Sequence, residues 1–174
     1  MIKYCLIGLS AVAIHLRGDD KVSIYDKKQD EPIFMALKGA SPEMVDARAQ
    51  AKQTLPAFRQ AIIDRKYPGA FFNVKGYFPE ADGSEGPHLW LWVRELNDDG
   101  LVCVPFELPK DFTGLKPDQK VLMKDADIED WMINHDGILY GGFSLRVQRS
   151  HVPETEREAF DRFIGVKEYK TEKP

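Results

Sequence analysis

Cysteine and histidine are scarce in this sequence, and their scarcity excludes the commonest kind of structural metal site. The 174 residues include two cysteines, Cys5 and Cys103, and four histidines scattered between positions 15 and 151. A structural zinc site needs about four cysteine or histidine ligands at short spacings. We therefore expect no metal site. Cys103 lies in the apolar run Leu101–Val104 and is expected to be a buried, unreactive thiol.

Long apolar runs and an excess of basic residues are also missing. The uncharged stretch from Tyr4 to Leu16 is shorter than the roughly 20 residues that a membrane-spanning helix needs. The chain has 24 basic and 28 acidic residues, a formal net charge of −4, whereas a dedicated nucleic-acid binder usually has a basic excess. We expect no integral membrane span and no affinity for nucleic acid. A protein partner, if there is one, is expected to be basic.

Nucleotide-binding and hydrolase motifs are absent as well. The sequence contains no Gly-x-Ser-x-Gly, no P-loop, no Gly-x-Gly-x-x-Gly and no His-Glu-x-x-His. No cofactor is expected. What the sequence does contain is ordinary for a folded protein, with 43% hydrophobic and 30% charged residues. A chain of this size can bury roughly 70% of its unfolded surface without a disulfide.

The N-terminal segment, residues 1–29, has two interpretations that the sequence leaves open. Lys3, a short apolar stretch and Ala11-Val12-Ala13 resemble a secretory signal with a small-residue cleavage site. The alternative is a strand over residues 3–16 that turns at Gly18-Asp19-Asp20. The first interpretation predicts an exported or periplasmic protein, and the second is compatible with a cytoplasmic one.

The rest of the chain is predicted to form a single domain. The charged, apolar-free stretch Lys27–Pro32 is typical of a linker, and a short apolar strand is expected at Ile33–Leu37. The domain is expected over residues 30–165. Residues 166–174 are predicted to be a charged tail that frays.

One long helix is predicted near the start of this domain. Ser41 can cap it, Pro42 suits its first position, and Glu43 complements the positive end of the dipole. Pro56 should kink the helix or split it near Thr54. The apolar residues at helical spacing, which we expect to face the core, are Val45, Ala51, Leu55, Phe58 and Ile62.

Strand patterns dominate the middle of the domain. Strands are predicted over 70–78, 88–96, 101–108 and 120–124, followed by a helical turn at 125–130, a hairpin joining 131–133 to 138–140, and a short helix over 154–164. Asn97–Gly100 and Asp136-Gly137 supply the turns. Gly141-Gly142 predicts a bulge or a close backbone approach, and residues 143–147 are either extended or helical. The predicted fold is α+β, a bent antiparallel sheet resembling a half-barrel, with a long kinked N-terminal helix packed on it and a short C-terminal helix.

Several stretches together resemble one family. They are Asp30-Glu31-Pro32 with Phe34-Met35, Ser41-Pro42-Glu43-Met44 continuing to Ala49-Gln50-Ala51 and Thr54–Phe58, His88–Leu91, Ile128–Met132, Asp136-Gly137, Gly141-Gly142-Phe143 and Arg146. In this order they resemble the YegJ-like bacterial family of unknown function (DUF2314), over roughly residues 30–165. The resemblance implies a small α+β domain and no particular activity. Family members often carry a signal or lipoprotein leader, which slightly favours export.

Two histidines are candidates for acid–base chemistry. His88 begins a predicted strand, and His135 precedes Asp136 at a hairpin tip. Each also has a structural interpretation that we favour: a hydrogen-bonded histidine at 88, and turn geometry alone at 136. Asp125, Asp127, Glu129 and Asp130 form an acidic cluster without the spacing of a calcium loop. Its simplest interpretation is a helix cap at Asp125 or Asp127 with solvated neighbours.

Tryptophans supply the candidate binding residues. Trp90 and Trp92 alternate with Leu89, Leu91 and Val93, so this strand is apolar on both faces. Either the long helix covers the tryptophans, or they line a binding groove together with Arg94 and His88. Trp131 is expected to bury its ring, and Arg146 is expected to reach back to Asp130 across the C-terminal hairpin.

Two functions remain open at this stage. The favoured one is a non-enzymatic binding module, either associated with the cell envelope or resembling the small acidic immunity proteins that protect a cell from a toxin. The alternative is a hydrolase-like enzyme that uses His88 or His135 with a nearby carboxylate. The arrangement in space decides between them, because an enzyme needs a polar group with a positioned partner inside a concave pocket.

Overall fold

The computed structural model describes residues 41–171 and 174. The expected signal or strand, the linker and the strand at 33–37 lie outside these residues. The described elements are α1 (Pro42–Ile63), β1 (Phe71–Tyr77), β2 (His88–Asn97), β3 (Gly100–Pro105), β4 (Val121–Met123), the 3-10 helix η1 (Asp125–Asp127), β5 (Asp130–His135), β6 (Ile138–Gly141), α2 (Phe143–His151), the 3-10 helix η2 (Glu154–Glu156), α3 (Arg157–Phe163) and β7 (Glu168–Tyr169).

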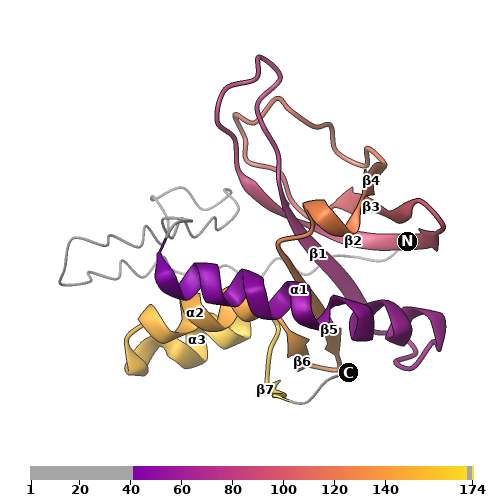
Figure 1. Ribbon diagram of the computed structural model, residues 1–174. Coiled ribbons are helices and arrows are strands. Elements are labelled where there is room, and N and C mark those ends of the chain that lie inside the picture. The colour runs from indigo at the N-terminus through magenta and orange to yellow at the C-terminus, as the bar shows by residue number, and fades with distance from the viewer. Residues whose placement is uncertain (1–40, 172–173) are drawn as a thin grey trace, which may run out of the picture.

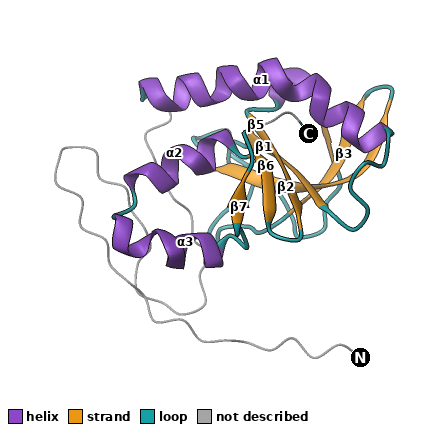
Figure 2. Cartoon of the chain, turned by 90° about the horizontal axis from the view of Figure 1, so that it is seen from below, coloured by secondary structure: helices purple, strands orange, loops and turns teal. Residues whose placement is uncertain are grey.

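The strands form one open, bent sheet in the order β4-β3-β2-β1-β5-β6-β7. Figure 1 shows α1 lying across the sheet, and Figure 2 shows α2 and α3 beside it, away from β2 and β3. The α+β prediction is confirmed. One detail was wrong: the sheet is mixed, because β7 pairs with β6 in parallel.

The start of α1 is built as its sequence predicts. The Ser41 hydroxyl accepts a hydrogen bond from the Met44 backbone N–H at 3.3 Å, and Pro42 stands at the first helical position. The helix bends along its length in Figure 2, but it runs unbroken through Pro56. The Thr54 hydroxyl donates to the Gln50 carbonyl at 2.7 Å, one turn earlier.

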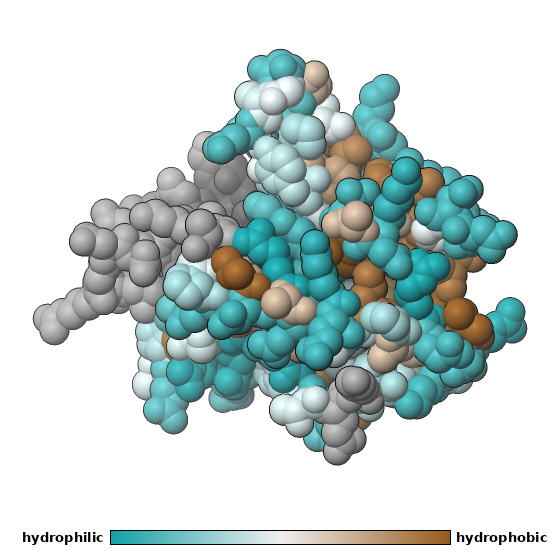
Figure 3. Space-filling view, viewed as in Figure 1, coloured by the Kyte–Doolittle hydropathy of each residue, from teal (hydrophilic) through white to brown (hydrophobic). Residues whose placement is uncertain are grey.

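The main core lies between α1 and the sheet face formed by alternate strand residues. Its buried members are Ala51, Leu55, Phe58, Ala61, Val74, Leu91, Leu101, Cys103, Met123, Ile128, Trp131 and Ile133. Val45 was wrongly assigned to this core: it is 52% exposed, and Met44 and Ala47 are buried instead. Hydrophilic side chains prevail over α1 in Figure 3, and apolar ones gather to its right, over the strands.

The C-terminal part is more ordered than its sequence suggests. Residues 143–151 form the helix α2, and the expected single helix over 154–164 is the short pair η2 and α3. The segment expected to fray contains β7, and Val166 in it is 4% exposed. Local sequence could not predict this, because β7 is held by pairing with β6 and by the Tyr169 hydroxyl, which donates to Asp161 at 2.5 Å.

The expected turns are present at both hairpins. The Asn97 side chain accepts hydrogen bonds from the backbone N–H groups of Asp99 and Gly100, both at 3.0 Å. Gly141 has a φ of +68°, and a Cβ there would lie 2.4 Å from the Trp131 carbonyl oxygen. The predicted close backbone approach is therefore confirmed. Within the described residues, no helix combines the length and apolar character that crossing a membrane requires.

Candidate functional site

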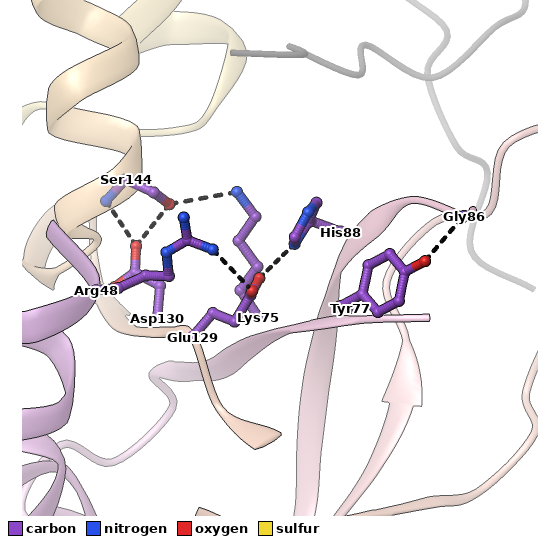
Figure 4. Close-up of polar contacts among 8 residues, drawn as sticks. All are labelled: Arg48, Lys75, Tyr77, Gly86, His88, Glu129, Asp130 and Ser144. Carbon is purple, nitrogen blue, oxygen red and sulfur yellow. Dashed lines mark hydrogen bonds and ion pairs between the residues drawn. The ribbon is translucent and has the colours of Figure 1, made fainter. Parts of the chain in front are cut away.

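Polar side chains from α1, β1, β2, β5 and α2 meet at one end of the sheet (Figure 4). The register explains the meeting, because Lys75 on β1 stands opposite Trp90 on β2 and opposite Asp130 on β5. We use the name polar cluster for six residues: Arg48, Lys75, His88, Glu129, Asp130 and Ser144.

Glu129 is the outer link of the polar cluster. Its carboxylate accepts from Arg48 on α1 at 3.2 Å and pairs with Nδ1 of His88 on β2. Burial alone would raise the pKa of Glu129, but the hydrogen bond with His88 and the charges of His88 and Arg48 lower it below its ordinary value. Glu129 therefore joins the helix to the sheet as a carboxylate.

The Glu129 links should stabilise the protein only where this carboxylate is charged. Because folding lowers the pKa of Glu129, its contribution to the free energy of unfolding is complete at pH values above the ordinary pKa of 4.5. That contribution is lost as the pH falls through the pKa of Glu129 in the folded protein. We expect Glu129→Gln to cost about 1 kcal/mol or less at pH 7, because the partners are partly exposed. Urea unfolding at pH 7 and pH 3.5 should show the difference from wild type shrinking at acid pH. A difference independent of pH would contradict this assignment.

Asp130 is the buried link of the polar cluster and caps α2. Its side chain is 1% exposed and accepts from the backbone N–H groups of Phe143 at 3.2 Å and Ser144 at 2.7 Å, both in the first turn of α2. The N-cap residue itself is Gly142, which has no side chain to offer. A carboxylate from β5 thus performs the task that a capping serine or aspartate performs elsewhere.

Lys75 is the cation that accompanies this buried carboxylate. The Ser144 hydroxyl donates to Asp130 at 2.6 Å and accepts from Nζ of Lys75 at 3.5 Å, so it lies between the two charges. Burial lowers the pKa of Lys75 and raises that of Asp130, while the attraction between them opposes both shifts. The Lys75 ammonium also lies 5.9 Å from the centre of the Trp90 ring.

Arg146 makes no hydrogen bond or ion pair with Asp130 among the described residues, so the expected direct contact is wrong, although burial lowers the pKa of Arg146 and the charge of Asp130 opposes this shift. The Arg146 guanidinium donates to the backbone carbonyls of Gly141 at 2.8 Å and Lys170 at 2.6 Å, and its plane lies over Tyr169. Arg146 therefore ties β6 to the segment after β7. Sequence reasoning missed Lys75 and Ser144 as the partners of Asp130, because nothing local to Asp130 indicates that β1 lies beside β5.

Trp131 is buried, as predicted. It is 1% exposed, and its indole N–H donates to the Ala51 carbonyl at 3.0 Å and to the Thr54 hydroxyl at 3.1 Å, both on α1. The rings of Phe58 and Phe143 lie 5.1 and 5.8 Å from it. These contacts give Trp131 a structural role in joining β5 to the helix.

Trp90 and Trp92 do not lie under the long helix. Leu91 between them packs in the α1 core, so the two tryptophans point to the opposite face of the sheet. Trp90 packs beside the second core cluster of Leu139, Leu145 and Val166. The interpretation that the long helix covers the two tryptophans was therefore wrong.

Trp92 belongs to a partly exposed surface on that opposite face. Its ring meets Phe106 edge-on at 5.0 Å, and the Arg94 guanidinium lies 4.9 Å from its centre. Phe106 is 52% exposed and Leu122 is 44% exposed. Trp92 stands opposite Val104 in β3, and Leu122 stands opposite Val102 in β3. Because Val102 and Val104 are two residues apart on one strand, Trp92 and Leu122 lie on the same face of the sheet. We use the name aromatic face for Trp92, Arg94, Phe106 and Leu122.

One buried amide on the same side of the sheet has no partner. Asn73 stands opposite Trp92 and Met132 and is 1% exposed, and neither its side-chain oxygen nor its nitrogen makes a hydrogen bond. Leaving such a group unsatisfied costs about 1–3 kcal/mol.

The remaining candidates have structural surroundings. Nε2 of His135 lies 3.8 Å from Asp136, whose side chain is 91% exposed and whose φ of +54° serves the turn. Asp125 does not cap η1, because the capping position is Lys124; it pairs instead with Arg59 at 2.6 Å. Burial raises the pKa of the Cys103 thiol to about 12, as suits an unreactive cysteine.

Two hollows in the described residues lie away from His88 and Glu129 and from the aromatic face. They have volumes of about 280 and 380 Å³ and are lined by residues of α1 and α2 and by the segment around Tyr67, respectively. Among the described residues, no three histidines, cysteines or carboxylates come together in a way that could hold a metal ion.

Comparison with known proteins identifies the family. Residues 41–167 match the family described as "Uncharacterized protein conserved in bacteria (DUF2314)". The chain belongs to this family. The match begins at the Ser41 cap and ends in the segment before β7, so it contains both the polar cluster and the aromatic face. The expected family is confirmed, and the early stretch Asp30–Met35 lies outside the matched residues.

A curated relative is similar over much of the chain. It is named "Putative ankyrin repeat protein", from Neisseria meningitidis serogroup B (strain ATCC BAA-335 / MC58), and is 28% identical over 155 residues. The similarity covers 84% of this chain and 56% of that protein, so this chain spans little more than half of the relative's length. No solved structure matches the chain significantly.

Proposed function

We propose that this chain is a non-enzymatic interaction module that binds another protein through the aromatic face. The observation that carries the proposal is the pairing of Trp92 with Phe106 and Arg94, where Phe106 is 52% exposed. Tryptophan and arginine are the residues most enriched among those that dominate binding energy at interfaces. Folding alone favours burying such rings.

Two further observations support an interaction role. Leu122 on the same face of the sheet is 44% exposed, so apolar surface extends beyond Trp92 and Phe106. The relative in Neisseria meningitidis is named as an ankyrin repeat protein, and such repeats expose extended binding surfaces. An envelope-associated or immunity-protein-like setting is compatible with a module of this kind.

The alternative function, a hydrolase-like enzyme, has one supporting observation. His88 pairs with Glu129, which is an arrangement that acid–base chemistry requires. Against it, neither hollow in the described residues includes this pair, and Ser144 is hydrogen-bonded to Asp130 and 2% exposed. The pair also joins two elements of the fold through Arg48. We therefore favour a structural role for His88.

A cross-linking experiment tests the proposed module. A photo-reactive phenylalanine analogue is placed at Phe106 or, as a control, at Phe163 on α3, which is similarly exposed at 51%. After irradiation in the native host, a cross-linked protein is expected from position 106 alone. The partner so identified is purified, and its dissociation constant is measured by calorimetry.

The expected result is loss of affinity at the aromatic face. Trp92→Ala should weaken binding at least tenfold with little change in the unfolding temperature, while Phe163→Ala should leave the affinity unchanged. Full affinity in Trp92→Ala would refute the proposed surface. If His88→Gln lost affinity and Trp92→Ala did not, the binding site would lie at the polar cluster instead.

A further inference from the structure

We infer that the aromatic face takes an acidic protein segment, one that presents carboxylates beside an apolar side chain. This inference rests on the proposed function and adds the chemistry of the partner. It reverses the expectation, drawn from the net charge of −4, that a partner would be basic.

The first observation is that Arg94 has no anionic partner within the described residues. Among the other described arginines, Arg48, Arg59, Arg149 and Arg162 form ion pairs with carboxylates, and Arg146 and Arg157 donate to backbone carbonyls, whereas the exposed Arg65, like Arg94, has neither kind of partner. Arg94 makes no such pair, and its recorded contact is the stacking over Trp92. The Arg94 side chain is exposed, and a guanidinium can bind a carboxylate with two parallel hydrogen bonds.

The second observation is that further unpaired cations border the same face. Lys120 and Lys124 are two residues before and two residues after Leu122, and the backbone at Lys124 is still extended. Side chains at a spacing of two in extended backbone point to the same side, so Lys124 lies on the side of Leu122, and Lys120 borders β4 at its other end. Both are exposed, and neither forms an ion pair in the described part of the chain.

The neighbouring carboxylates do not neutralise this group. The register shift between Val93 and Glu95 places Glu95 opposite Val102, so this exposed carboxylate shares the aromatic face, and Glu107 follows Phe106. Neither forms an ion pair with Arg94, Lys120 or Lys124 among the described residues. Charges act over a Debye length of about 8 Å at physiological salt, so the nearby cations, rather than the net charge of the chain, decide what docks here.

The apolar part of the face defines the rest of the partner. Phe106, Leu122 and the edge of Trp92 would cover an apolar side chain, while Arg94 and the two lysines would pair with flanking carboxylates. Single-stranded nucleic acid also stacks on aromatic rings next to cations. A protein segment is favoured, because three cations are few for a polyphosphate chain, whose binding depends on many phosphate contacts.

Three matched peptides of twelve residues test the partner's charge. They share two leucines and a tryptophan and carry, at the same four positions, aspartate, asparagine or lysine, and each is labelled for fluorescence anisotropy. Oligo-dT of the same length is measured beside them. The full chain should bind the aspartate peptide at least tenfold more tightly than the others, and its affinity should fall steadily between 50 and 300 mM NaCl as flanking charges are screened.

Variants locate the binding on the protein. Arg94→Gln combined with Lys124→Gln should weaken binding of the aspartate peptide at least tenfold. Arg65→Gln is the matched control, because Arg65 is exposed and forms no ion pair among the described residues. That variant should bind as the wild type does.

The outcomes separate this inference from the proposed function. Equal binding of the three peptides, binding of none, or tighter binding of the lysine peptide or of oligo-dT would overturn the acidic partner. The proposed interaction module would still be supported if binding of the protein that cross-links at position 106 depended on Trp92. Conversely, loss of the aspartate peptide in Arg94→Gln/Lys124→Gln but not in Trp92→Ala would support the charge assignment and refute the proposed surface.

Discussion

Truncating Trp131 to alanine is expected to lower the free energy of unfolding by about 3–5 kcal/mol. The indole is 1% exposed, its ring packs between Phe58 and Phe143, and its N–H ties β5 to two acceptors on α1. Alanine would leave a cavity at the centre of the core and would remove the indole N–H that joins β5 to the Ala51 carbonyl and the Thr54 hydroxyl. Chemical denaturation monitored by circular dichroism measures the change.

Two further variants distinguish a packing role for Trp131 from a binding role. Trp131→Phe keeps a ring but loses both hydrogen bonds, so its cost should be smaller than that of alanine. Trp90→Ala is the matched control on the other face of the sheet, where the ring is only half-buried, and it should cost less than Trp131→Ala. A Trp131→Ala protein with full stability and lost partner binding would refute the structural role.

Removing the Asp130 carboxylate is expected to be comparably damaging, at about 3–5 kcal/mol for Asp130→Ala. The change deletes the cap of α2 and leaves the Lys75 ammonium buried beside Trp90 without its counter-charge. It also removes the acceptor of the Ser144 hydroxyl. Thermal and urea unfolding at pH 7 provide the measurement.

A double-mutant cycle identifies the partner of Asp130. Asp130→Asn and Lys75→Met should be strongly non-additive, with a coupling of about 1–3 kcal/mol, because each single change strands the other charge. The same cycle with Arg146→Met should give a weaker coupling, since Arg146 is bonded to backbone carbonyls. Equal coupling in the two cycles would contradict the arrangement in the polar cluster.

Local signals predicted much of the fold because they depend on few neighbours. The Ser41 cap, the turn at Asn97–Gly100 and the close approach at Gly141 each follow from hydrogen bonds or φ angles within a few residues. The strands were found from their alternation for the same reason. Val45 was assigned wrongly, because it lies six residues before Ala51, whereas the buried face continues through Ala47 and Met44 at helical spacings of four and three.

The candidate sites depended on contacts between distant parts of the chain. His88 and Trp92 were recognised as candidates, but their surroundings follow from the pairing of β1 with β2 and β5. That register brings Lys75 beside Asp130 and orients Trp92 away from α1. No pattern around any one of these residues carries that information, because side chains on a strand have two possible faces and the neighbouring strand comes from elsewhere in the sequence.

By itself, the sequence determined the α+β class, the family resemblance and the burial of Trp131, since composition, caps, turns and apolar periodicity are local properties. Only the tertiary structure decided that Lys75 and Ser144, not Arg146, accompany Asp130, and that residues after 166 add a strand. Only the tertiary structure also shows that no carboxylate of the described residues forms an ion pair with Arg94. The physical reason is that ion pairs, strand register and exposure are properties of pairs of segments, and they exist only once the chain has folded.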